Sequence, residues 1–191
     1  MAFKKPKDYD NVRIGEARIL PAGGYICKIL KAEETESKAG RPMIKVAFDI
    51  ADGEYAGYFR DRFDTWRTGA EDPAEVKWPF AGTKWILLYN NDGETNRDFK
   101  SFCTSLEESG REVWKNDMLD AAGLKDAKVG VIFRREEHDY NGRSWRTVPC
   151  GFRSVKTIQE GTFNVPEDKP LPAQSNEITD SFSAMEDDIP F

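Results

Sequence analysis

Hydrophobic and polar residues alternate along several short stretches of this chain, and the alternation predicts β-strands. In residues 43–50, Ile44, Val46, Phe48 and Ile50 fall on every second position, as in a strand with one buried face. The same reading, with strands bounded by glycine, proline or polar turns, predicts five strands at residues 25–32, 43–50, 58–65, 128–137 and 144–155. A shorter apolar stretch at residues 85–89 also favours a strand.

An amphipathic helix is predicted between the third and fourth of these strands. Apolar residues recur there at the spacing of one helical face, namely Phe99, Phe102, Cys103 and Leu106. Thr95 is placed to cap the start of this helix, with Asp98 three residues later, and Gly110 is placed to end it. Residues 117–124 predict a second, short helix.

The predicted elements follow the order of a known fold. Three strands precede the helix and a two-stranded hairpin with an Asn141-Gly142 turn follows it. An irregular insertion at residues 66–83 comes before the helix. This is the order of the OB-fold, a five-stranded Greek-key barrel with a helix between strands 3 and 4. We therefore expect a mainly β protein with an N-terminal arm at residues 1–22 and an OB-fold domain at residues 23–165.

The charge of the chain is unevenly distributed, and this changes what its acidity implies. The net charge of −6 argues at first against a nucleic-acid partner. However, residues 166–191 hold seven acids and one base, so the other 27 acids and 27 bases cancel. That segment is rich in proline and serine and has no sustained apolar period, which predicts a disordered tail. The body is neutral and can present a basic groove.

Composition indicates a soluble intracellular protein without a cofactor. No run of 18 apolar residues exists, so no membrane partner is expected, and the lysine-rich start lacks the apolar segment of a signal peptide. Cys27, Cys103 and Cys150 are odd in number and far apart, which favours a reducing cytoplasm over disulfides. A zinc site with His138 lacks any local chelating pair, so no metal is expected.

The C-terminal residues carry a specific resemblance. Asp187, Asp188, Ile189, Pro190 and Phe191 match the terminal peptide of bacterial and phage single-stranded-DNA-binding proteins (SSBs). The long arm, the insertion and the short tail make the chain most similar to phage-encoded SSBs of DNA replication, recombination and repair. The resemblance implies that a partner protein binds these five residues: a helicase, primase, polymerase, exonuclease or recombinase. It also implies location in the host-cell cytoplasm for a bacteriophage protein.

Binding single strands without sequence preference requires cations along the phosphates and aromatic faces that stack on bases. In an OB-fold these lie on strands 2 and 3 and on the 1–2 and 4–5 loops. The candidate DNA-binding residues in those places are Lys38, Arg41, Lys45, Tyr58, Arg60, Arg62, Trp66, Arg67, Tyr140, Arg143, Trp145 and Arg146. We expect a homodimer, because a neutral body offers few bases for one groove.

Other interpretations remain open for several of these residues. Trp85 and Trp114 favour the core, whereas Trp66 and Trp145 are balanced between core and stacking. Arg60 and Arg62 fit a solvated strand face as well as a DNA site.

Two alternative functions also remain. The first is an adaptor whose body binds protein rather than DNA. The second is a metal-dependent nuclease using the neighbouring acids Asp49, Asp52, Glu54 and Asp61. We favour a non-enzymatic protein that binds and protects single-stranded DNA, because two of those acids lie in a predicted turn.

Overall fold

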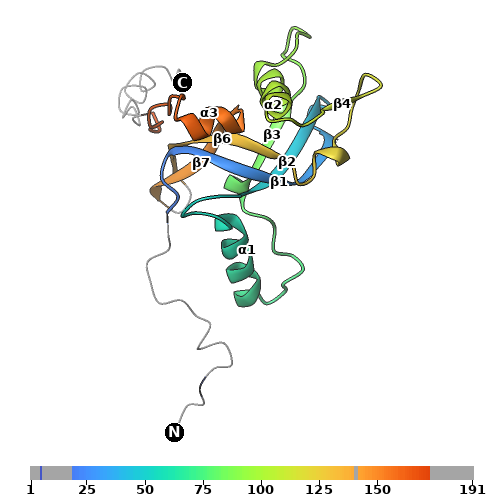
Figure 1. The fold of residues 1–191 in the computed structure, drawn as a ribbon. Coiled ribbons are helices and arrows are strands. Elements are labelled where there is room, and N and C mark those ends of the chain that lie inside the picture. The colour runs from blue at the N-terminus through green and yellow to red at the C-terminus, as the bar shows by residue number, and fades with distance from the viewer. Residues whose placement is uncertain (1–4, 6–18, 140–141, 173–191) are drawn as a thin grey trace, which may run out of the picture.

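The computed structural model describes residues 5, 19–139 and 142–172 and centres on one antiparallel sheet (Figure 1). Five strands hydrogen-bond in the order β3-β2-β1-β6-β7. Their bounds are β1 (Gly23–Glu36), β2 (Pro42–Ile50), β3 (Thr83–Leu87), β6 (Lys128–Asp139) and β7 (Arg143–Arg153). The other elements are α1 (Tyr58–Gly69), η1 (Phe80–Gly82), α2 (Arg97–Glu108), β4 (Trp114–Lys115), β5 (Met118–Leu119), η2 (Ala122–Leu124) and α3 (Val155–Glu160). The fold is therefore mixed α/β and rich in strands.

The sheet is open. Strands β3 and β7 form its two edges, and no ladder joins them within the described part of the chain. The short turn η1 contacts both edge strands and spans the opening between them. The sequence predicted five strands with a helix between the third and fourth, and the sheet has this number and order, but its third strand is β3 rather than residues 58–65. The predicted closed barrel is not seen.

The core lies where the alternating apolar residues meet α2. Ile44, Val46 and Phe48 are fully buried, as their spacing predicts. Helix α2 buries the predicted face of Phe99, Phe102, Cys103 and Leu106. The Phe102 ring meets that of Phe152 on β7, with centroids 4.9 Å apart.

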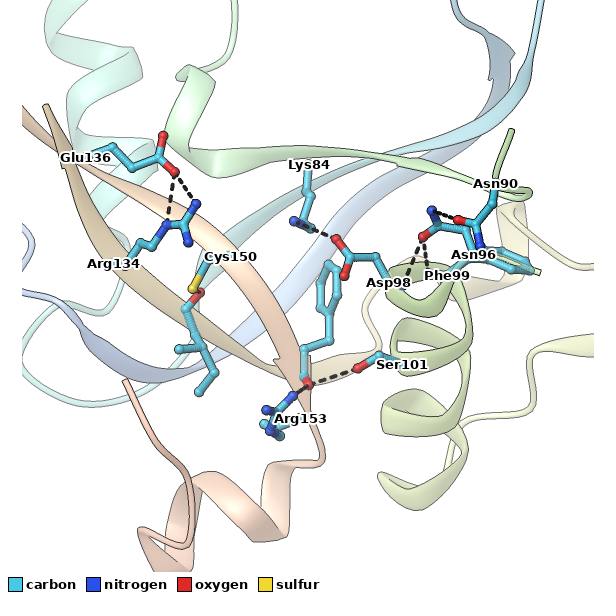
Figure 2. A network of polar contacts seen from close by, with 12 residues as sticks. Lys84, Asn90, Asn96, Asp98, Phe99, Ser101, Arg134, Glu136, Cys150 and Arg153 are labelled. Atoms are coloured by element: carbon cyan, nitrogen blue, oxygen red, sulfur yellow. Dashed lines mark hydrogen bonds and ion pairs between the residues drawn. The ribbon is translucent and has the colours of Figure 1, made fainter. Parts of the chain in front are cut away.

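The residue that caps α2 is Asn96 and not the predicted Thr95. The Asn96 side-chain oxygen accepts hydrogen bonds from the backbone N–H groups of Asp98 at 2.9 Å and Phe99 at 3.4 Å. Its amide nitrogen donates to Asn90 at 3.0 Å (Figure 2). The second contact holds the cap in place, and Thr95 offers no equivalent.

The prediction of a strand at residues 58–65 is wrong, because these residues form helix α1. Phe59 and Phe63 alternate with polar residues, but they are also four residues apart, which places them on one helical face. Gly57 precedes the helix with φ of 75°, a left-handed conformation, and its N–H donates to the Ile50 carbonyl at 2.9 Å, which closes the turn between β2 and α1. Figure 1 shows α1 projecting to one side of the sheet, away from α2.

Asp49 supplies the cap that α1 lacks locally. One oxygen of its buried carboxylate accepts from the N–H groups of Ile50 and Phe59, each at 2.9 Å. The other oxygen accepts from the N–H of Arg60 at 3.1 Å. Burial raises the pKa of this carboxyl, and the three N–H groups offset part of the rise. A strand residue thus stabilises the first turn of the helix that follows it.

Smaller differences concern the element boundaries. The strand predicted at residues 85–89 begins and ends two residues earlier, as β3. The short helix predicted at residues 117–124 is wrong: the segment holds β5 and then η2. The Asn141 turn position lies outside the described residues.

The first part of the predicted tail docks on the sheet. Beyond residue 133, β6 no longer pairs with β1, and the Lys169 backbone takes up that edge. The Lys169 N–H donates to the Arg135 carbonyl and the Lys169 carbonyl accepts from the Glu137 N–H, both at 2.9 Å. We call residues 168–172 the strap. None of the described helices is long and apolar enough to cross a membrane.

Candidate nucleic-acid interface

One row of side chains crosses the face of the sheet opposite the core. Lys45 on β2 lies directly across from Glu33 on β1 and from Trp85 on β3. Directly paired residues project to the same face. The neighbouring pair Ile44 and Ile86 projects to the other face and is buried. Lys45 and Trp85 therefore point away from the core.

Phe80 extends this row toward β7. Its ring centroid lies 5.5 Å from that of Trp85, and the guanidinium of Arg146 lies 5.0 Å from the Phe80 centroid. Phe80 is 55% exposed and Trp85 is 42% exposed, although both are large and apolar. We call Lys45, Phe80, Trp85 and Arg146 the outer cluster. Exposed rings beside cations can stack on bases while the cations meet phosphates.

The outer cluster also includes a competing anion at its edge. The Lys45 ammonium lies 3.3 Å from the Glu33 carboxylate, which also pairs with Lys31. These two lysines lower the pKa of Glu33, so the carboxylate is charged at neutral pH. A phosphate that reaches Lys45 must displace this partner. The exposed ion pair is weak enough for such an exchange.

A second group of aromatic and basic side chains lies on α1. Arg62 donates to the Tyr58 hydroxyl at 2.8 Å and lies 5.6 Å from the Trp66 ring centre. Trp66 is 45% exposed. These three residues are four positions apart and share one side of the helix.

The opposite side of α1 reaches the outer cluster through Trp78. Arg60 lies 5.2 Å and Phe63 lies 5.3 Å from the Trp78 ring centre. Arg67 covers Phe63 at 5.5 Å. The Trp78 indole N–H donates to the Gly82 carbonyl at 3.1 Å, within the turn η1 that carries Phe80. The α1 group and the outer cluster are thus joined through one turn.

The third group lies on the arm formed by β6 and β7. The Arg135 guanidinium lies 4.9 Å from the Trp145 ring centre and 3.4 Å from the carboxylate of Asp168 in the strap. Arg143 lies 3.8 Å from the Glu137 carboxylate and donates to the Pro172 carbonyl at 3.1 Å. The strap therefore contacts Arg135 on β6 and Arg143 on β7.

The structure divides the predicted site residues among these groups. Lys45 and Arg146 lie in the outer cluster, Tyr58, Arg60, Arg62, Trp66 and Arg67 on α1, and Arg143 and Trp145 on the arm. Lys38 is exposed in the turn between β1 and β2, and Arg41 donates to the Tyr89 carbonyl at 2.7 Å. Tyr140 and the tip residues Asp187, Asp188, Ile189, Pro190 and Phe191 lie outside the described residues.

Sequence reasoning missed the two aromatic residues of the outer cluster. Trp85 was predicted to be core, as was Trp114, yet Trp85 projects from the outer face and Trp114 is 39% exposed. The alternation of Trp85 with the buried Ile86 was the available signal. Phe80 lies in a turn without periodicity, so no pattern in the sequence indicated its role.

The acids considered for metal-dependent cleavage have structural partners. Asp49 caps α1, and Asp52 forms an ion pair of 3.1 Å with Lys128. Among residues 5, 19–139 and 142–172, no three His, Cys, Asp or Glu side chains gather in a way that could hold a metal ion.

Comparison with protein families matches the N-terminal part of the chain. A family model described as a protein of unknown function (DUF669) matches residues 7–70. The matched range includes β1, β2 and α1. It therefore covers Lys45 on β2 and the aromatic and basic side chains of α1. A search of curated proteins found no match to the chain.

Proposed function

We propose that this protein binds single-stranded DNA without sequence preference and recruits replication or recombination proteins through its C-terminal tip. The observation that carries the proposal is the outer cluster, in which Lys45 and Arg146 flank the exposed rings of Phe80 and Trp85. Base–aromatic stacking tolerates any sequence, because every base has a flat face.

The strand order supports an OB-type body. With β6 and β7 counted as the fourth and fifth strands, the order is 3-2-1-4-5. An OB-fold has this order and is itself only partly closed, with its ligand on strands 2 and 3 and the adjoining loops. Lys45 and Trp85 of the outer cluster lie on the equivalent strands β2 and β3, and Arg143 and Trp145 lie near the equivalent of the 4–5 loop.

Tryptophan fluorescence tests the proposal directly. Trp85, Trp66 and Trp145 are partly exposed beside cations, so stacking of oligo-dT should quench their emission. Affinity should fall linearly with salt on a double-logarithmic plot, with a slope of about −0.7 per phosphate neutralised. Absence of quenching and of binding at low ionic strength would refute DNA binding.

Removal of residues 186–191 separates this proposal from an adaptor function. The tip is acidic and competes with phosphate for cations, so its removal should leave DNA affinity unchanged or higher. A pull-down of replication proteins should be lost at the same time. A body that binds no DNA while the tip still captures those proteins would favour the adaptor.

A further inference from the structure

A groove of about 740 Å³ lies between α2 and the junction of β7 with α3. One wall is formed by α2 residues at helical spacing and the other by residues 152–157. The lining side chains that carry donors include Arg97, Lys100, Ser101, Thr104, Arg153 and Thr157. None of them belongs to the outer cluster, so the groove is a separate surface.

The groove carries more positive than negative charge among the residues that the structure describes. Arg97, Lys100 and Arg153 are all exposed, and none forms an ion pair within the described ranges. Glu108 is the single acid in the lining. By contrast, Lys45 in the outer cluster is paired with Glu33. The groove therefore presents three cations that attract an anion without displacing a protein partner.

The floor of the groove orients one of these cations. The Ser101 hydroxyl donates to the Phe152 carbonyl at 3.2 Å, and Arg153 donates to the same oxygen at 2.6 Å (Figure 2). This shared acceptor holds the guanidinium against α2 and leaves its other N–H groups for a ligand. A guanidinium group binds phosphate oxygens through two parallel N–H donors, and the remaining N–H groups of Arg153 can serve in this way. Thr104 and Thr157 add hydroxyls to the same groove.

We propose that this groove binds the phosphate backbone of the single strand that occupies the outer cluster. The inference rests on the proposed function and extends its site. Arg146 and Arg153 lie seven residues apart on β7, a separation of about 23 Å for a strand. One continuous nucleic-acid strand of ordinary site size can cover both places. An acidic aromatic peptide fits less well, because Phe152, the one aromatic residue in the lining, is buried and cannot stack on a ring of the peptide.

Oligonucleotide length provides the test. The variant R97Q/K100Q/R153Q removes the three charges, and its binding is measured with oligo-dT of about 4 and about 25 nucleotides. We expect a loss of at least about tenfold for the long oligonucleotide and little change for the short one. The salt slope for the long oligonucleotide should decrease by up to about 2, or about 0.7 for each lost contact.

The control variant K115Q/K125Q/K128Q removes the same charge outside the groove and should behave like the wild type. Circular dichroism and thermal unfolding check that both variants are folded. If the R97Q/K100Q/R153Q variant bound the long oligonucleotide as tightly as the wild type, the proposed role of the groove would be overturned. The proposed DNA binding at the outer cluster would not be affected. Tighter DNA binding by this variant would also overturn the proposed role and would indicate that the groove binds an acidic peptide segment. If the wild-type protein bound neither length, the proposed function itself would fail.

Discussion

Asp49 on β2 accepts a hydrogen bond of 2.9 Å from the backbone N–H of Phe59, the only fully buried residue of α1. The same carboxylate also accepts from Arg60. Asp49→Ala leaves these buried N–H groups without acceptors, so the free energy of unfolding should fall by about 2–4 kcal/mol. Urea denaturation measures the loss. Asp52→Ala is the control, because an exposed ion pair contributes at most about 1 kcal/mol. Equal losses would contradict the capping role.

The Asp49 carboxyl also predicts a dependence of stability on pH. Burial raises its pKa in the folded protein above the ordinary value of 3.8. The folded state then holds this proton more tightly than the unfolded state. The resulting stabilisation is complete below pH 3.8 and is lost as the pH rises through the folded pKa. The stability difference between wild type and Asp49→Asn, which does not titrate, should therefore shrink toward neutral pH. A difference that grows with pH would contradict the raised pKa.

Trp85→Ala and Phe80→Ala should each weaken oligo-dT binding. Loss of one stacked base costs about 1–3 kcal/mol, which is roughly a 5- to 150-fold loss of affinity. Fluorescence anisotropy of a labelled oligonucleotide measures the effect independently of the tryptophans. Trp114→Ala is the matched control, because Trp114 is exposed to a similar degree and packs against Phe99 on α2. The site assignment would fail if Trp114→Ala weakened binding as much as Trp85→Ala.

Two glycines beneath α3 should differ in their tolerance of alanine. A Cβ on Gly130 would lie 2.4 Å from Ile158 and 2.8 Å from the Arg153 backbone oxygen. The atoms nearest to a Cβ on Gly24 would belong to the side chains of Phe163 and Ile158, at 2.4 Å and 2.9 Å. Side chains can rotate away whereas the backbone cannot, so Gly130→Ala should destabilise by about 3 kcal/mol and Gly24→Ala by about 1 kcal/mol. Phe163→Ala should rescue Gly24→Ala, as thermal unfolding would show.

The strap should be released by Lys169→Pro. Proline lacks the N–H that donates to the Arg135 carbonyl, so the parallel bridge to β6 loses one of its two hydrogen bonds. The amide of Glu137, which donates to the Lys169 carbonyl, should then exchange with solvent faster. Lys169→Ala keeps the N–H and should retain the wild-type rate. Unchanged exchange in Lys169→Pro would show that the strap does not depend on this bond.

Hydrophobic periodicity in the sequence correctly predicted the elements whose buried faces repeat along the chain. The alternation in β2 and the spacing of Phe99, Phe102, Cys103 and Leu106 on α2 both match the buried faces. Residues 58–65 were misassigned because the short alternation of Phe59 and Phe63 with polar residues fits both a strand and a helix. The contact that favours the helix comes from Asp49, nine residues before the helix begins. Phe80 and Trp85 meet across a turn, which no periodicity encodes.

The strap fixes the point from which the rest of the chain departs. Pro172 is held by Arg143 on the arm that also carries Trp145. Residues 173–191 can reach at most about 65 Å from that point. A protein gripped by the final residues would therefore be confined near the arm at an effective concentration on the order of 1 mM. Even a partner with weak affinity for the DNA or for the folded body would then remain close to the bound single-stranded DNA.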